Sequence, residues 1–120
     1  MKKNLIIAPH ADDETLGCGG TILKLKRNKE SVNCIILSNY DKINDKKLYN
    51  QRIKELAKIK KHYKFDSFYL GEFIANTLDE QKKTKIISLL KKIILKIKPK
   101  RIFVPYYNDA HSDHKTVYDC

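Results

Sequence analysis

Cysteine is scarce in this chain of 120 residues, and tryptophan is absent. The three cysteines, Cys18, Cys34 and Cys120, are odd in number and include no CxxC pair. This pattern argues against a disulfide framework and against a four-cysteine zinc site. We therefore expect reduced thiols in a cytoplasmic protein.

Long apolar runs are also missing. The apolar residues that follow Lys2 and Lys3 stop at Pro9, too early for the core of a signal peptide, and no other run is long enough to span a membrane. Repeats, linkers and low-complexity segments are absent as well. With 42% hydrophobic residues, the sequence predicts one soluble domain over residues 1–120.

Acidic residues are outnumbered, with 14 Asp and Glu against 25 Lys and Arg, which gives a formal charge of +11. Such an excess can favour nucleic acid, an anionic membrane or a phosphorylated substrate. Here the lysines are spread along the expected helices and alternate with Ile and Leu rather than with aromatic residues. This spacing favours solvated helix surfaces, and we expect no nucleic-acid partner.

Apolar segments alternate with segments of helical periodicity. We expect strands at Leu5–Ala8, Val32–Leu37, Phe65–Leu70 and Arg101–Pro105, with Gly71 ending the third. Helices are expected from the Thr15–Thr21 segment to about Asn28, at Leu48–His62, from a cap at Leu78–Glu80 to about Ile97, and after the loop Tyr106–His114. This alternation predicts an α/β fold with a doubly wound, mostly parallel Rossmann-like sheet, in which an order of 3-2-1-4 makes the first and fourth strands neighbours.

Two clusters of histidine and acidic residues follow the first and fourth expected strands. The first is His10-Ala11-Asp12-Asp13-Glu14 and the second is Asp109-Ala110-His111-Ser112-Asp113-His114. Crowded acids are unfavourable unless something offsets their charge, and a metal ion does so. Because ligands bind beyond the carboxyl ends of parallel strands, we expect the clusters to converge on a catalytic metal. Helix capping or a favourable interaction with the helix dipole is the alternative for either cluster alone.

The glycine-rich segment Gly17-Cys18-Gly19-Gly20 admits a different interpretation, a dinucleotide-binding loop. The third glycine of that motif is missing, since Ile22 stands in its place, and acidic residues occupy the turn where a pyrophosphate would lie. Close packing of a helix on the sheet is the better interpretation. Cys18 is a poor nucleophile candidate because the nearby acids raise a thiol pKa.

The segments Pro9–Glu14, Leu16–Thr21 and His111–His114 together resemble the PIG-L/LmbE-like zinc N-deacetylases. That family has a His-x-Asp-Asp-Glu motif after the first strand and a His-Pro-Asp-His-like motif after a later one. In this chain Ser112 replaces the usual proline, which affects loop stiffness more than chemistry. Family members are commonly longer, so the sequence is expected to correspond to the amino-terminal part of such an enzyme, with a truncated sheet.

The resemblance implies a role for each motif residue. His10, Asp13 and His114 would bind Zn²⁺, and Asp12 would be the general base that deprotonates the attacking water. His111 would stabilise the oxyanion or protonate the departing amine, with Asp113 orienting it. Arg52, in an R-x-x-E pattern, is similar to a helix arginine that contacts substrate in this family.

The reaction implied by the resemblance is hydrolysis of the acetamide of an N-acetylated amino sugar or glycoconjugate. A metal-dependent hydrolase acting on another amide is one alternative, and a non-catalytic basic α/β module that binds nucleic acid or an anionic glycan is another. Two histidines and one aspartate would also hold Fe²⁺, cobalt or nickel. The oligomeric state stays open, a homo-oligomer included.

Overall fold

The computed structural model describes residues 2–10, 13–74, 77–78, 82–104 and 112–120, with the backbone alone at 13–18, 72 and 112–115. Strands and helices alternate along the chain, as the sequence predicts. Their order is β1 (Lys3–Ala8), α1 (Asp13–Arg27), β2 (Ser31–Asn39), α2 (Lys46–Tyr63), β3 (Ser67–Ile74), α3 (Lys83–Ile97), β4 (Arg101–Phe103) and α4 (Ser112–Asp119).

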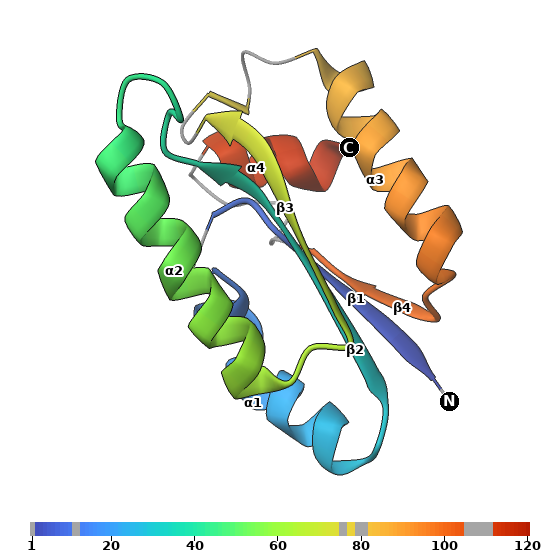
Figure 1. Ribbon diagram of the computed structural model, residues 1–120. Coiled ribbons are helices and arrows are strands. Elements are labelled where there is room, and N and C mark those ends of the chain that lie inside the picture. The colour runs from blue at the N-terminus through green and yellow to red at the C-terminus, as the bar shows by residue number, and fades with distance from the viewer. Residues whose placement is uncertain (1, 11–12, 75–76, 79–81, 105–111) are drawn as a thin grey trace.

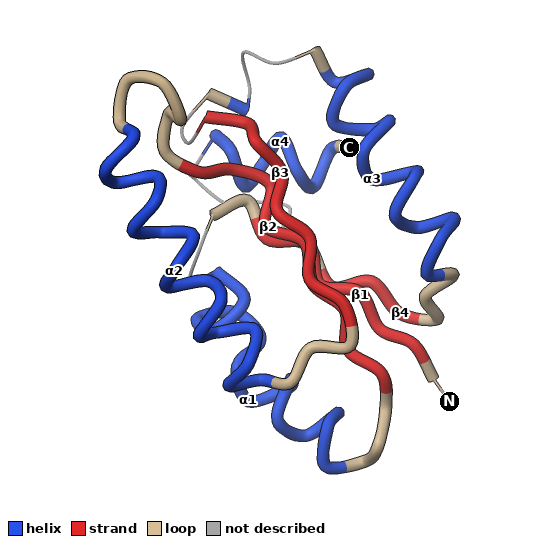
Figure 2. Tube along the Cα trace, in the orientation of Figure 1, coloured by secondary structure: helices blue, strands red, loops and turns tan. Residues whose placement is uncertain are grey.

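The strands form one parallel sheet with the order β3-β2-β1-β4. The helices α1 and α2 cover one face, and α3 and α4 cover the other (Figure 1). The tube in Figure 2 shows the strands as a twisted layer between these two helix layers. The doubly wound, mostly parallel α/β prediction is confirmed, including the placement of β1 beside β4.

Each face of the sheet has its own apolar core, because successive side chains of a strand point to opposite faces. Leu5 and Ile7 of β1 pack with α3 and with Val117 of α4. Ile6 and Ala8 pack on the other face with residues of α1 and α2. Burial on both faces explains why Leu5–Ala8 of β1 and Cys34–Leu37 of β2 are continuously apolar rather than alternating.

A polar network joins all four strands at their amino ends. The Asn4 side chain of β1 is fully buried, and its Nδ2 donates to the Ser31 carbonyl oxygen at 3.0 Å. Its Oδ1 accepts from Arg101 Nε of β4 at 3.0 Å. Asn33 of β2 donates to the Asn4 carbonyl oxygen at 3.1 Å and accepts a hydrogen bond from the Ser67 hydroxyl of β3. These buried polar groups are satisfied only in one register of the sheet.

Strand β3 is longer than predicted, since it continues through Gly71 to Ile74 instead of ending at the glycine. The register shifts there, because Ile36 pairs with Leu70 whereas Ser38 pairs with Phe73. An added Cβ at Gly71 would lie 2.6 Å from the Leu37 carbonyl oxygen. The glycine therefore serves close approach of two backbones at a β-bulge and does not end the strand.

Helix α3 begins at Lys83, later than the predicted cap at Leu78–Glu80. Leu78 is instead fully buried among residues of the α3 and α4 core, and Lys82 has an extended backbone. Leu78 therefore packs into the core from the connection that precedes α3 and does not open the helix. Smaller differences are an earlier start of α2 at Lys46 and an earlier end of β4 at Phe103.

The lysines of α2 and α3 that the sequence assigns to solvated surfaces are exposed. Within the described part of the chain, no helix is long and apolar enough to cross a membrane.

We predict that Gly71→Ala destabilises the fold, because the new methyl group meets the Leu37 backbone rather than a movable side chain. The expected loss is about 1 to 3 kcal/mol of unfolding free energy, measured by urea denaturation. Gly20→Ala is the matched control, since its Cβ would have nothing within 4 Å and alanine is favoured in a helix. Equal midpoints for both variants would contradict this account of the bulge.

Asp66, just before β3, gives a pH-dependent prediction. Burial acts to raise the pKa of Asp66, but hydrogen bonds from Val32 N–H at 2.7 Å and Lys26 Nζ at 3.0 Å outweigh it and lower the pKa below the ordinary 3.8. A carboxyl group with a lowered folded-state pKa adds stability above its unfolded pKa, and that stability is lost as the pH falls through the folded pKa.

We therefore expect the wild-type urea midpoint to fall more steeply than that of Asp66→Asn as the pH drops below 3.8. Asp45→Asn is the control, because the Asp45 side chain makes no cap hydrogen bond. Parallel pH profiles for the wild type and Asp66→Asn would refute the role of this carboxylate.

Candidate functional site

The first motif leaves the sheet beside the end of β2. The Pro9 carbonyl oxygen accepts hydrogen bonds from Ser38 N–H at 3.0 Å and from the Ser38 hydroxyl. This pairing extends the β1–β2 ladder one residue beyond β1, so the partly buried His10 emerges level with the last residues of β2. The backbone then enters α1 at Asp13, which places the second predicted ligand position at a helix start next to the sheet.

The glycine-rich segment lies within α1 and is helical. A dinucleotide-binding loop would form the turn before such a helix. The packing interpretation of these small residues therefore fits the structure better than a phosphate cradle.

The second motif follows β4, and its last three residues open α4. Val117 of α4 is buried against the same core as Leu5 and Ile7 of β1, so α4 packs on the face of the central strand. Since β1 and β4 are paired neighbours, both motifs leave the same edge of the sheet. The topology thus brings together two segments that are about a hundred residues apart in the sequence.

The inner geometry of the predicted metal centre lies outside the described residues. Asp12 and His111 are not described, nor are the side chains of Asp13, Asp113 and His114. Among the side chains that are described, no three His, Cys, Asp or Glu groups gather around a common point. A donor set of two imidazoles and one carboxylate suits a catalytic zinc ion, and the position of both motifs at one edge of the sheet is compatible with such a set. Because the side chains concerned are not described, the ligand assignment stays a prediction.

Arg52 lies near the same edge, on α2. Its guanidinium carbon is 5.4 Å from the centre of the Tyr40 ring, and Tyr40 directly follows β2. Arg52 Nε is also 3.5 Å from Glu55 Oε2, so the R-x-x-E pattern corresponds to an ion pair within one helical turn. The cation–π contact holds the arginine against the end of β2.

The connection between β2 and α2 is ordered by Asp41. Its Oδ1 accepts hydrogen bonds from Ile43 N–H at 2.8 Å and Asn44 N–H at 3.1 Å, and Oδ2 accepts from the Asn44 side chain. These hydrogen bonds, above all that of the Asn44 backbone, lower the pKa of Asp41. A turn fixed in this way sets the direction in which Tyr40 leaves the sheet.

Sequence reasoning missed two residues at this edge, Asn39 and Tyr40. The sequence predicts a polar loop over Ser38–Asp45, and nothing in this segment singles out Asn39 or Tyr40. The one signal in the sequence is that Asn39 is a polar residue close behind the apolar run Cys34–Leu37. In the structure it ends β2, which is buried along its whole length. The structure shows that Asn39 is only 5% exposed and that its Oδ1 accepts a 2.8 Å hydrogen bond from Tyr40 N–H.

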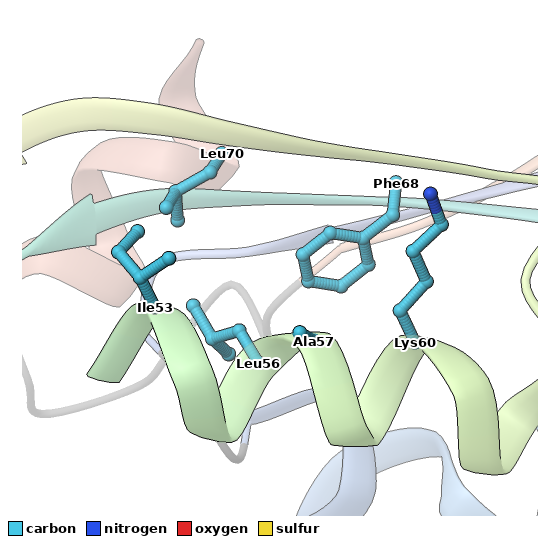
Figure 3. Close-up of a pocket in the computed structure, with 6 residues that line it drawn as sticks. All are labelled: Ile53, Leu56, Ala57, Lys60, Phe68 and Leu70. Atoms are coloured by element: carbon cyan, nitrogen blue, oxygen red, sulfur yellow. The ribbon is translucent and has the colours of Figure 1, made fainter. Parts of the chain in front are cut away.

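A separate cavity of about 230 Å³ lies between α2 and β3 (Figure 3). Its lining is apolar apart from the Lys60 side chain. It offers no pair of groups for acid–base chemistry, and we do not include it in the site.

The fold and the two motifs define a class: a doubly wound α/β protein with a His/Asp-rich edge at the carboxyl ends of β1 and β4. The family model described as PIG-L, GlcNAc-PI de-N-acetylase, matches residues 5–120. The chain therefore belongs to the PIG-L family. No curated protein sequence matches it.

Solved structures share the fold. A conserved protein from Thermus thermophilus is 27% identical, with a TM-score of 0.81 over 99% of this chain and 53% of that one. The N,N'-diacetylchitobiose deacetylase from Pyrococcus horikoshii is 26% identical, with a TM-score of 0.80 over 97% and 46% of the two chains. The 4-carboxy-2-hydroxymuconate hydratase from Pseudomonas putida is 14% identical, with a TM-score of 0.79 over 99% and 53%. The chain spans about half the length of these proteins.

We predict that the two motifs share one metal ion. Protein purified without chelator should contain about one equivalent of zinc, and both His10→Ala and His114→Ala should lower it severalfold, because three ligands hold a catalytic zinc ion. His62→Ala is the control, since His62 is exposed at the end of α2. Elemental analysis of folded protein measures the content. Unchanged zinc in His114→Ala would show that the second motif is not a ligand.

Proposed function

We propose that residues 1–120 form one α/β domain carrying the catalytic edge of a metal-dependent N-deacetylase. The observation that carries this proposal is the pairing of β1 with β4, which brings both family motifs to one edge. Membership of the PIG-L family supports the reaction class. If the two motifs lay at opposite ends of the strands, they could not form one site.

In this proposal His10, Asp13 and His114 hold Zn²⁺. When bound, zinc polarises an amide carbonyl and lowers the pKa of water to about 7. Asp12, next to a ligand but not a ligand itself, accepts the proton of the attacking water. His111 in its protonated form offsets negative charge on the carbonyl oxygen or gives a proton to the leaving amine, and Asp113 orients its ring. The products are acetate and a free amine.

Arg52 is proposed to contact the substrate. Its contacts with Tyr40 and Glu55 fix the guanidinium near the end of β2, so that its donors need little reorganisation on binding. Since Arg52 is not at the reacting acetamide in this proposal, its removal should affect KM more than kcat.

For the substrate we propose an N-acetylated amino sugar or a glycoconjugate of it. The family model is described by a GlcNAc-PI de-N-acetylase, and one structurally similar protein is a diacetylchitobiose deacetylase. The hydratase with a similar fold shows that the fold hosts other reactions. For this reason the acetamide reaction is proposed on the motifs and the family, not on the fold.

We predict that the chain releases acetate from N-acetylglucosamine or diacetylchitobiose, and that Asp12→Asn lowers kcat by about 10²- to 10⁴-fold, as expected for loss of a general base. Zinc content should not change, since Asp12 is not a ligand. Asp45→Asn, in the exposed turn before α2, is the control. Acetate can be measured with a coupled enzymatic assay alongside elemental analysis.

Three results would contradict parts of this proposal. Acetate release that survives Asp12→Asn would remove Asp12 from the base role. Hydrolysis of other acylated amines but not of amino sugars would favour another amide substrate. Salt-dependent binding of nucleic acid or an anionic glycan that survives loss of His10 and Asp13, without any hydrolysis, would favour the basic binding module, because phosphate contacts from lysines do not need a metal.

A further inference from the structure

Three asparagines are buried in the sheet, and they differ in how their amides are paired. Asn4 and Asn33, at the amino ends of their strands, both donate from Nδ2 to carbonyl oxygens at 3.0 and 3.1 Å. Asn39 ends β2 at the carboxyl edge and is equally buried. Its Nδ2 is enclosed, yet it has no acceptor within the part of the chain that the structure describes.

The orientation of the Asn39 amide is set by its other atom. Oδ1 accepts the 2.8 Å hydrogen bond from Tyr40 N–H, so Nδ2 is the group left to donate. A buried amide donor that lacks an acceptor costs free energy, and proteins rarely retain one without a use. Nδ2 has less than 1 Å² of exposed surface, so a ligand oxygen reaches it only when the side chains that enclose it move aside, and the hydrogen bond then formed offsets this cost.

The position of Asn39 relates this donor to the predicted metal edge. Ser38 N–H is hydrogen-bonded to the Pro9 carbonyl oxygen, and the register of β1 with β2 puts Ser38 level with His10, so Asn39 lies on the neighbouring strand one residue beyond this level. Ile35 and Leu37 belong to the core on the α3 and α4 face, and alternation along β2 puts Asn39 on this same face. The extra residue of the bulge lies in β3, so the alternation along β2 continues. Helix α4, which carries the second motif, packs on that face through Val117.

We propose that Asn39 is a substrate-specificity residue, whose Nδ2 donates a hydrogen bond to a ring hydroxyl of an N-acetylated amino sugar. This inference rests on the proposed deacetylase function. That function leaves the acetamide oxygen to the metal and His111, so the oxygen that meets Asn39 belongs to the sugar ring. An amide donor suits a neutral hydroxyl, and a site built to bind a hydroxyl rejects an analogue that lacks it.

Binding is tested by calorimetric titration of N-acetylglucosamine and its monodeoxy analogues into the zinc-loaded Asp12→Asn protein, in which turnover does not consume the probe. Asn39→Ala is added to this background, because it removes the donor and leaves no group for the hydroxyl to bind. Coupling to a single hydroxyl separates loss of this donor from loss of the Tyr40 contact, since the latter would weaken the binding of every analogue alike. Asn28→Ala is the control, because Asn28 is exposed at the end of α1.

We expect Asn39→Ala to bind N-acetylglucosamine about tenfold more weakly, as for loss of one hydrogen bond, with no change in Asn28→Ala. One monodeoxy analogue should also bind the Asp12→Asn protein that keeps Asn39 about tenfold more weakly than the parent sugar does. The same analogue should bind Asn39→Ala no worse than the parent sugar does, because the two changes remove the same bond. If Asn39 had a purely structural role, or if its amide bound only a buried water, the effect of the Asn39 substitution on affinity would not depend on one particular hydroxyl of the sugar.

The outcomes separate this inference from the proposed function. If the sugar binds but no analogue couples to Asn39, the specificity role is overturned, while acetate release by the wild type still supports the deacetylase. If the Asp12→Asn protein that keeps Asn39 binds no amino sugar, the inference is overturned, and the acetate assay on the wild type decides the proposed function by itself.

Discussion

The register of the sheet is fixed by buried polar groups at its amino ends, and the placement of the two His/Asp motifs depends on it. Asn4 hydrogen-bonds to β2 and β4 together, and Glu30 binds both Asn4 and Arg101. Slipping β4 by one residue would separate these partners and turn its side chains to the opposite faces. Apolar packing alone tolerates such slips more readily, since Ile, Leu and Val are near equivalents. The amino ends thus align the carboxyl ends, where the two motifs emerge.

Much of the architecture could be predicted from the sequence because burial on both faces leaves a strong signal. The runs at Leu5–Ala8 and Val32–Leu37 predict parallel strands. The His/Asp motifs that follow the first and fourth strands predict that the site lies at the carboxyl ends of these strands. The prediction that Gly71 ends the strand is wrong because a glycine that ends a strand and a glycine in a bulge look the same in sequence. What distinguishes them is the approach of Leu37, a contact between segments far apart in the chain.

Leu78 and Asn39 show the same limit of prediction from local sequence, one in the core and the other at the candidate site. Leu78 fits a helix start by spacing, yet tertiary burial takes it into the core. Asn39 fits a polar loop by composition, yet it is enclosed at the end of β2. For the candidate site, the sequence provides the residue types that we expect to bind a metal, whereas the contact of Arg52 with Tyr40 depends on how α2 lies over β2. A contact of this kind between a helix and the end of a strand leaves no recognisable pattern in a single sequence.

The hydrogen bond from Arg101 to Asn4 joins residues 97 positions apart, whereas Asn4 reaches Ser31 across only 27. Closing the longer loop costs more chain entropy, and non-local contacts of this kind slow folding. The three strands β1, β2 and β3 can pair through shorter loops, but the second motif arrives only when β4 docks on β1. Assembly of the candidate site is therefore tied to the completion of folding: a chain that has paired its first three strands already has most of its sheet but has not yet placed the second motif beside the first.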